Sequence, residues 1–208
     1  MKNMKKILLL ALAIMPLAGW GQTLKQSGTS PQDVIPEGWK IQYAYGDMNK
    51  DGVLDLAVIA FPEEETAAPL LGIYWRTKSG LYRLYHEYAA FPANDNGLVI
   101  PEYDLSISDK GVLSIEYSVF YTAGSWSTDR DTYRFRYQQG DFFLIGHDTG
   151  SLMRNTGEVT EVSLNFLTHK RQTVKYNVLE GNDERSEKWS RIPKEPLISL
   201  SDWRIEEM

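Results

Sequence analysis

Short runs of alternating apolar and polar residues recur along this chain, and turn residues separate them about every eight to twelve positions. In residues 39–45, for example, an aromatic or β-branched side chain occupies every second position. A period of two predicts strands that bury one face, and the 12 Tyr, 6 Trp and 7 Phe suit pleated sheets. The sequence therefore predicts an all-β fold.

The pattern predicts about ten or eleven strands and almost no helix, arranged as an antiparallel meander, a sandwich or an open barrel. One helical turn is expected within residues 199–208. The expected strands are residues 39–45, 56–61, 70–76, 81–87, 98–100, 112–121, 132–137, 142–148, 159–167, 171–178 and 189–192. The chain would supply fewer than three four-stranded blades, so a closed propeller, which needs at least four, is not expected.

Residues 1–21 predict a signal peptide. Three lysines precede an apolar run at residues 7–18, and small residues follow, with cleavage expected after Gly21 or, as the second choice, after Gly19. The apolar run is shorter than the roughly 20 residues that a membrane span needs. Residues 22–38 are rich in Gln, Ser, Thr, Gly and Pro and predict a flexible lead-in. Residues 39–208 are expected to form a single all-β domain that is periplasmic or secreted, without a membrane anchor.

Composition excludes several classes of chemistry and partner. The chain has no cysteine, which excludes thiolate metal sites, thiol catalysis, disulfides and a lipid anchor on cysteine. The formal net charge is −6 and falls to about −9 when the three lysines of the leader are removed. A surface of that sign repels phosphate backbones, so nucleic acid is not expected as a partner.

The acid-rich stretch DMNKDGVLD, between two apolar runs, is the part of the sequence that indicates a chemistry. Its glycine at position six permits a sharp turn, and hard oxygen ligands favour calcium over zinc or copper. Side-chain oxygens at positions one, three, five and nine and a backbone carbonyl at position seven are the expected ligands: Asp47, Asn49, Asp51, Asp55 and Val53. The alternative is a polar hairpin turn that binds nothing.

The flanking strands and the aspartate at position nine make this loop similar to the FG-GAP/VCBS repeat of integrin-type propellers and many secreted bacterial proteins. The matching residues are Gly46, Asp47, Asn49, Asp51, Gly52 and residues 55–58. The resemblance implies a calcium-binding β-hairpin loop in an extracellular setting. It covers about 20 of the 208 residues and occurs once, and Ile59-Ala60-Phe61-Pro62 replaces the Gly-Ala-Pro that usually follows. The rest of the chain resembles secreted proteins of gut Bacteroidetes that carry one such loop, which implies no activity.

These features predict a secreted or periplasmic calcium-binding β-domain that acts as a binding or interaction module for a glycan or a protein surface. The alternative is a carbohydrate-binding protein or a glycan-processing enzyme, with Trp126 and nearby acids at its site. His147 and Asp148 at a predicted strand end would be able to orient a base. No Gly-x-Ser-x-Gly nucleophile elbow accompanies them. The sequence therefore predicts no catalytic residue.

Overall fold

The computed structural model describes residues 23–64, 67–92, 99–121, 125–180 and 185–205. The predicted signal peptide at residues 1–21 lies outside these ranges. Within them, no helix is long and apolar enough to cross a membrane.

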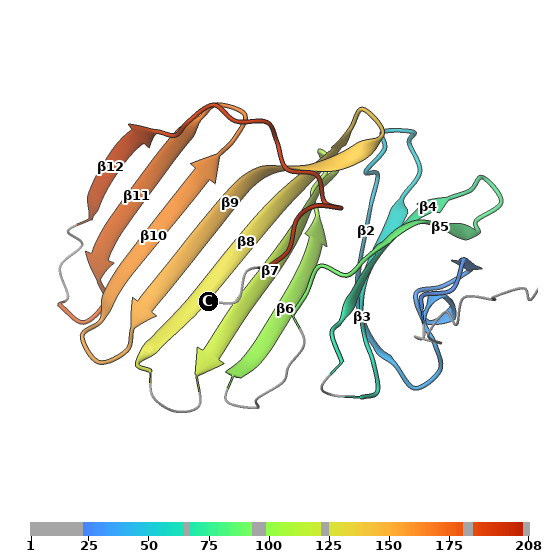
Figure 1. The fold of residues 1–208 in the computed structure, drawn as a ribbon, viewed down its shortest axis with the longest axis horizontal. Coiled ribbons are helices and arrows are strands. Elements are labelled where there is room, and N and C mark those ends of the chain that lie inside the picture. Colours follow the sequence, from blue (N-terminus) through green and yellow to red (C-terminus); the bar gives the residue numbers. More distant parts are fainter. Residues whose placement is uncertain (1–22, 65–66, 93–98, 122–124, 181–184, 206–208) are drawn as a thin grey trace, which may run out of the picture.

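Twelve antiparallel strands in the described part of the chain form two sheets (Figure 1). The five-stranded sheet has the order β1-β5-β4-β3-β2 and consists of β1 (Ser27–Gly28), β2 (Lys40–Gly46), β3 (Asp55–Phe61), β4 (Leu70–Arg76) and β5 (Tyr82–Tyr88). The seven-stranded sheet has the order β12-β11-β10-β9-β8-β7-β6 and consists of β6 (Val99–Ile107), β7 (Val112–Tyr121), β8 (Ser127–Gln138), β9 (Asp141–Met153), β10 (Glu158–Asn165), β11 (Lys170–Asn177) and β12 (Ser186–Arg191). Each strand after β1 pairs with its neighbours in the chain within its sheet, so the predicted antiparallel all-β fold is confirmed, and it is not a closed propeller.

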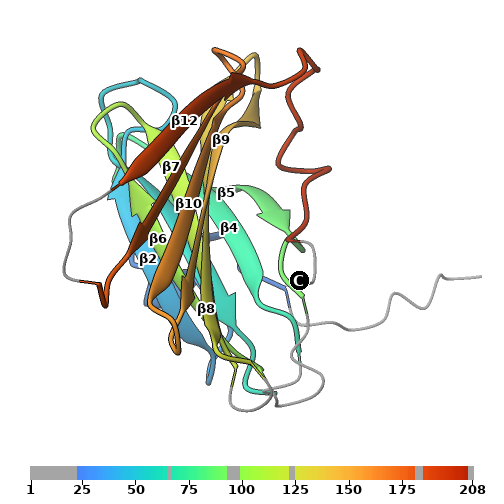
Figure 2. The same cartoon turned by 90° about the vertical axis from the view of Figure 1, so that its left-hand side faces the viewer.

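The edge strands β2 and β6 lie beside each other, so the two sheets continue into one curved half-barrel (Figures 1 and 2). The approach is close: a Cβ atom added to Gly46 of β2 would lie 2.2 Å from Cγ2 of Ile107 in β6. Glycine is therefore required where the two sheets meet.

The main core lies between the facing sides of the two sheets. Ile59 and Ile73 from the five-stranded sheet and Ile115 and Phe135 from the seven-stranded sheet are completely buried there. Strand β3 is buried on both faces, as its continuous apolar run predicts, because alternate residues enter a second cluster on the far side of its sheet.

The N-terminal segment covers that second cluster. The sequence predicts a flexible lead-in at residues 22–38, whereas the structure buries Leu24 and Val34 and forms a 3₁₀ helix, η1 (Gln32–Val34). The single proton of the Tyr74 hydroxyl is shared between the carbonyls of Lys25 (3.0 Å) and Val34 (3.3 Å). A few buried side chains hold this irregular segment against the sheet. Its apolar residues follow neither a strand nor a helix period, so the sequence pattern does not reveal the packing.

The C-terminal segment also packs on the core, on one side of the seven-stranded sheet (Figure 2). Ser199 forms an isolated antiparallel bridge with Phe143, and the Leu200 N–H donates to the Phe142 carbonyl at 2.8 Å. Leu200 and Trp203 are buried. The helical turn predicted within residues 199–208 is absent from the described part, residues 199–205, which forms a bridge and a turn instead.

Candidate functional site

The loop between β2 and β3 is folded by hydrogen bonds from its own backbone to its side chains. The two carboxylate oxygens of Asp47 accept the N–H groups of Asp51 (3.1 Å) and Gly52 (3.0 Å). The Asn49 side-chain oxygen also accepts the Asp51 N–H (3.0 Å), and the Asp51 carboxylate accepts the Val53 N–H (2.8 Å). Gly52 has a φ of +84°, as expected for a sharp turn at that position. The structure thus gathers Asp47, Asn49 and Asp51 into one turn.

Asp55, the fourth predicted side-chain ligand, has a different environment. It lies fully buried at the start of β3, where its carboxylate oxygens accept the N–H groups of Met48 (3.1 Å) and Arg76 (3.2 Å). Asp55 therefore connects the loop to the last residue of β4, Arg76. Burial raises the pKa of Asp55 to about 6, although the N–H donors oppose the rise.

The donor set fits a hard divalent cation in kind, since it consists of carboxylate, amide and backbone oxygens. A carboxylate oxygen has two lone pairs, so it can accept an N–H and still bind a cation. The described residues nevertheless contain no group of three or more His, Asp or Glu side chains arranged to hold a metal ion. Calcium would be held by Asp47, Asn49, Asp51 and the Val53 carbonyl. Asp55 would also bind the ion, while its carboxylate still accepts the N–H groups of Met48 and Arg76.

The turn between β6 and β7 supports the loop from the other sheet. A Cβ atom added to Gly111 would lie 2.4 Å from the backbone oxygen of Asp47, and Gly111 has a φ of +69°. The Lys50 ammonium donates to the Asp109 carbonyl at 3.2 Å. The sequence identifies Gly111 only as a turn residue, because nothing in it shows that two distant hairpins meet here.

Without calcium, the protein should become more stable as the pH falls from 7 to 5, because Asp55 takes up a proton in the folded state. Its folded pKa of about 6 lies above the ordinary value of 3.8, so stability rises as the pH falls through 6 and the gain levels off near 3.8. Proton linkage for one such group amounts to about 1.4 kcal/mol between pH 7 and pH 5. Urea unfolding in EDTA measures this gain.

Asp55→Asn should remove this part of the pH dependence, since asparagine keeps an acceptor oxygen and does not titrate. Other acids titrate equally in both proteins, so the difference between them isolates Asp55. Identical pH profiles for the wild type and the variant would contradict the raised pKa.

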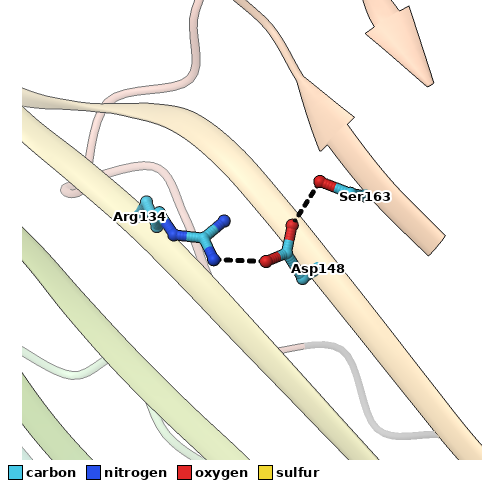
Figure 3. Close-up of polar contacts among 3 residues, drawn as sticks. All are labelled: Arg134, Asp148 and Ser163. Carbon is cyan, nitrogen blue, oxygen red and sulfur yellow. Dashed lines mark hydrogen bonds and ion pairs between the residues drawn. The ribbon is translucent and has the colours of Figure 1, made fainter. Parts of the chain in front are cut away.

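A second polar site lies on the face of the seven-stranded sheet that points away from the core. Asp148 of β9 accepts a hydrogen bond from Ser163 of β10 (2.7 Å) and forms an ion pair with Arg134 of β8 (Figure 3). Burial alone would raise the pKa of Asp148, but the hydrogen bonds from Arg134 and Ser163 outweigh it and lower the pKa. The Asp148 hydrogen bond in turn raises the pKa of Arg134.

Two adjoining hollows of about 250 and 390 Å³ lie on this face, and they share Glu116, Arg130, Gly150 and Glu161 among their lining residues. The smaller hollow also includes Asp148. The residues of this site come from five strands and form no motif, so the sequence alone does not reveal it.

The pair that the sequence suggested, His147 with Asp148, is not a pair in the structure. Successive residues of a strand point to opposite faces, so the two side chains diverge. Instead, Nε2 of His147 lies 2.6 Å from Oδ1 of the buried Asp131 in β8. The imidazole ring stacks on the Tyr133 ring, with the two centroids 4.3 Å apart. Trp126 is 64 % exposed and does not line either hollow.

No protein-family model, curated protein or solved structure matches the chain.

Proposed function

We propose that this protein is an extracytoplasmic β-domain that binds calcium in the loop between β2 and β3 and acts as a binding module. The observation that supports it is the arrangement of Asp47, Asn49 and Asp51, whose oxygens all accept backbone N–H groups of the same short turn. Two carboxylates held so close repel each other, and a divalent cation removes that repulsion. The leader predicted at residues 1–21 supports a location where calcium is at millimolar concentration, which fills a loop of modest affinity.

The ion would act on the junction of the two sheets. The loop begins at the end of β2, contacts the Gly111 turn through the Asp47 backbone and is tied to β4 through Asp55. Calcium bound by Asp47, Asn49, Asp51, Val53 and Asp55 would fix these elements relative to each other. The proposed role is structural, and the partner would bind elsewhere on the surface.

Calcium should raise the melting temperature of EDTA-treated protein. At a free concentration tenfold above the dissociation constant, ligand linkage adds about 1.4 kcal/mol, or roughly 3–6 °C for a domain of this size. Asp51→Ala should abolish the rise, because it removes a carboxylate that both orients Val53 and would hold the ion. Circular dichroism melts over a calcium titration measure the effect.

The matched control is Asp104→Ala, which removes an exposed aspartate of β6 outside the loop and should leave the calcium response intact. An unchanged melt of the wild type with calcium would refute the calcium site. A rise that survives in Asp51→Ala would place the ion elsewhere.

Carbohydrate binding is the second candidate function, and the polar hollows on the outer face of the seven-stranded sheet favour it. Glycan processing would need two carboxylates on either side of a bound sugar. Glu116 and Glu161 both line the hollows, but Arg130 pairs with the first (3.7 Å) and Tyr176 donates to the second (3.0 Å). Groups paired in this way suit the recognition of sugar hydroxyls.

A further inference from the structure

The floor of the larger hollow is a glycine on the outer face of β9. Gly150 pairs with Arg130 of β8 on one side and with Glu161 of β10 on the other. A Cβ atom added to Gly150 would meet nothing within 4 Å, and its φ lies outside the left-handed range. The open space above β9 is therefore bounded by the side chains of the neighbouring strands.

Paired polar groups form the walls of the hollow. On one wall the Arg130 guanidinium lies 3.7 Å from the Glu116 carboxylate. On the other wall the Tyr176 hydroxyl donates to Glu161 at 3.0 Å. Arg134, Asp148 and Ser163 form a polar network (Figure 3). Asp148 and Ser163 line the smaller hollow, so this network adjoins the larger one.

The hollow also has an apolar end. Leu152 of β9, Val159 of β10 and Val178, just after β11, line the larger hollow together with Tyr176. Its volume of about 390 Å³ lies within the roughly 300–1,000 Å³ typical of small-ligand sites. The same surface thus offers hydrogen-bonding groups and an apolar wall side by side.

This combination matches a sugar better than an ion. A sugar hydroxyl both donates and accepts, so it can bond an arginine N–H and a carboxylate oxygen together. The C–H face of a sugar ring is apolar and can lie on Leu152 or Val159, whereas the Arg185 guanidinium already lies over the Tyr176 ring, 4.6 Å from its centroid. Each acidic group of the hollow has a partner already. The guanidinium groups of Arg130, Arg134 and Arg185 only balance the carboxylates of Glu116, Asp148 and Glu161, so these groups leave no excess positive charge for an anionic ligand.

We infer that the hollow over Gly150 binds a segment of a neutral oligosaccharide. The inference rests on the proposed binding module and gives it a ligand class and a place. It does not rest on calcium, because the hollow belongs to β7–β11 and the calcium loop to the β2–β3 connection.

The test fills the hollow without disturbing the fold. Cellohexaose, xylohexaose, mannohexaose and maltohexaose are titrated into the full mature chain by isothermal calorimetry, with a wider array of neutral glycans beside them. At least one should bind, and Gly150→Leu should weaken that binding tenfold or more, because the new side chain occupies the open space. Ser106→Leu places the same side chain on the outer face of β6, beyond the lining residues, and should leave the affinity unchanged.

The inference would be overturned if no neutral glycan binds the wild type, or if Gly150→Leu binds as tightly as the wild type. Preferential binding of polygalacturonate or a sulfated glycan would also overturn it, since the ligand would then be anionic. Melting with calcium is recorded for every variant. A calcium response that persists in Gly150→Leu while glycan binding is lost separates this site from the proposed calcium function.

Discussion

Replacing Trp203 with alanine should lower the free energy of unfolding by about 3–5 kcal/mol. The indole is 5 % exposed and packs against the rings of Tyr133 and Phe135, with centroids 4.7 and 5.0 Å away. Those two rings belong to β8, so the loss opens a cavity between the C-terminal segment and the seven-stranded sheet. The melting temperature should fall by roughly 6–20 °C for a domain of this size. Thermal and urea unfolding measure the change.

Trp126→Ala and Trp189→Ala are the matched controls, since these indoles are 64 % and 57 % exposed. Each should change the stability by less than about 0.5 kcal/mol, the usual range for surface substitutions. Equal destabilisation by all three substitutions would contradict the packing of the C-terminal segment on the core.

Replacing Gly111 with alanine should cost about 2–5 kcal/mol. The position has a φ of +69°, which costs a residue with a Cβ atom about 1–2 kcal/mol. The added Cβ atom would also lie 2.4 Å from the backbone oxygen of Asp47, so the loop or the turn must move, at about 1–3 kcal/mol. The displaced Asp47 should bind calcium more weakly, which a calcium titration of the variant measures.

Gly140→Ala separates the two costs. Gly140 has a φ of +86°, but its added Cβ atom would meet nothing within 4 Å. This control should lose only the roughly 1–2 kcal/mol of stability that a positive φ costs, and it should keep the calcium response of the wild type. If both variants lose the same stability and bind calcium equally, the turn between β6 and β7 does not support the loop.

The fold was predictable where side chains alternate between a core and solvent. Strand β7 shows this alternation along its whole length, and the sequence predicts the observed bounds, Val112–Tyr121. The expected strands 132–137 and 142–148 are too short, because β8 and β9 continue to Ser127 and Met153 with few apolar residues. Backbone hydrogen bonds to the neighbouring strands extend β8 and β9 beyond the residues whose side chains alternate between apolar and polar.

The candidate sites were predictable to different degrees. The sequence predicts a sharp turn at Gly52, and the structure has one; the hydrogen bonds from its backbone to Asp47 and Asn49 were not predicted. Burial of Asp55 could not be predicted, because it depends on β4, whose last residue, Arg76, lies 21 residues further along the chain. The hollow over Gly150 depends on the register of five strands, which the sequence does not determine.

A crystal structure of the protein with millimolar calcium, with anomalous data collected for the ion, tests the proposed calcium site most directly. We predict an anomalous peak in the loop between β2 and β3, about 2.3–2.6 Å from side-chain oxygens of Asp47, Asn49, Asp51 and Asp55 and from the Val53 carbonyl. A loop that is free of such a peak at that concentration, with its aspartates bonded only to backbone amides, would contradict the proposal.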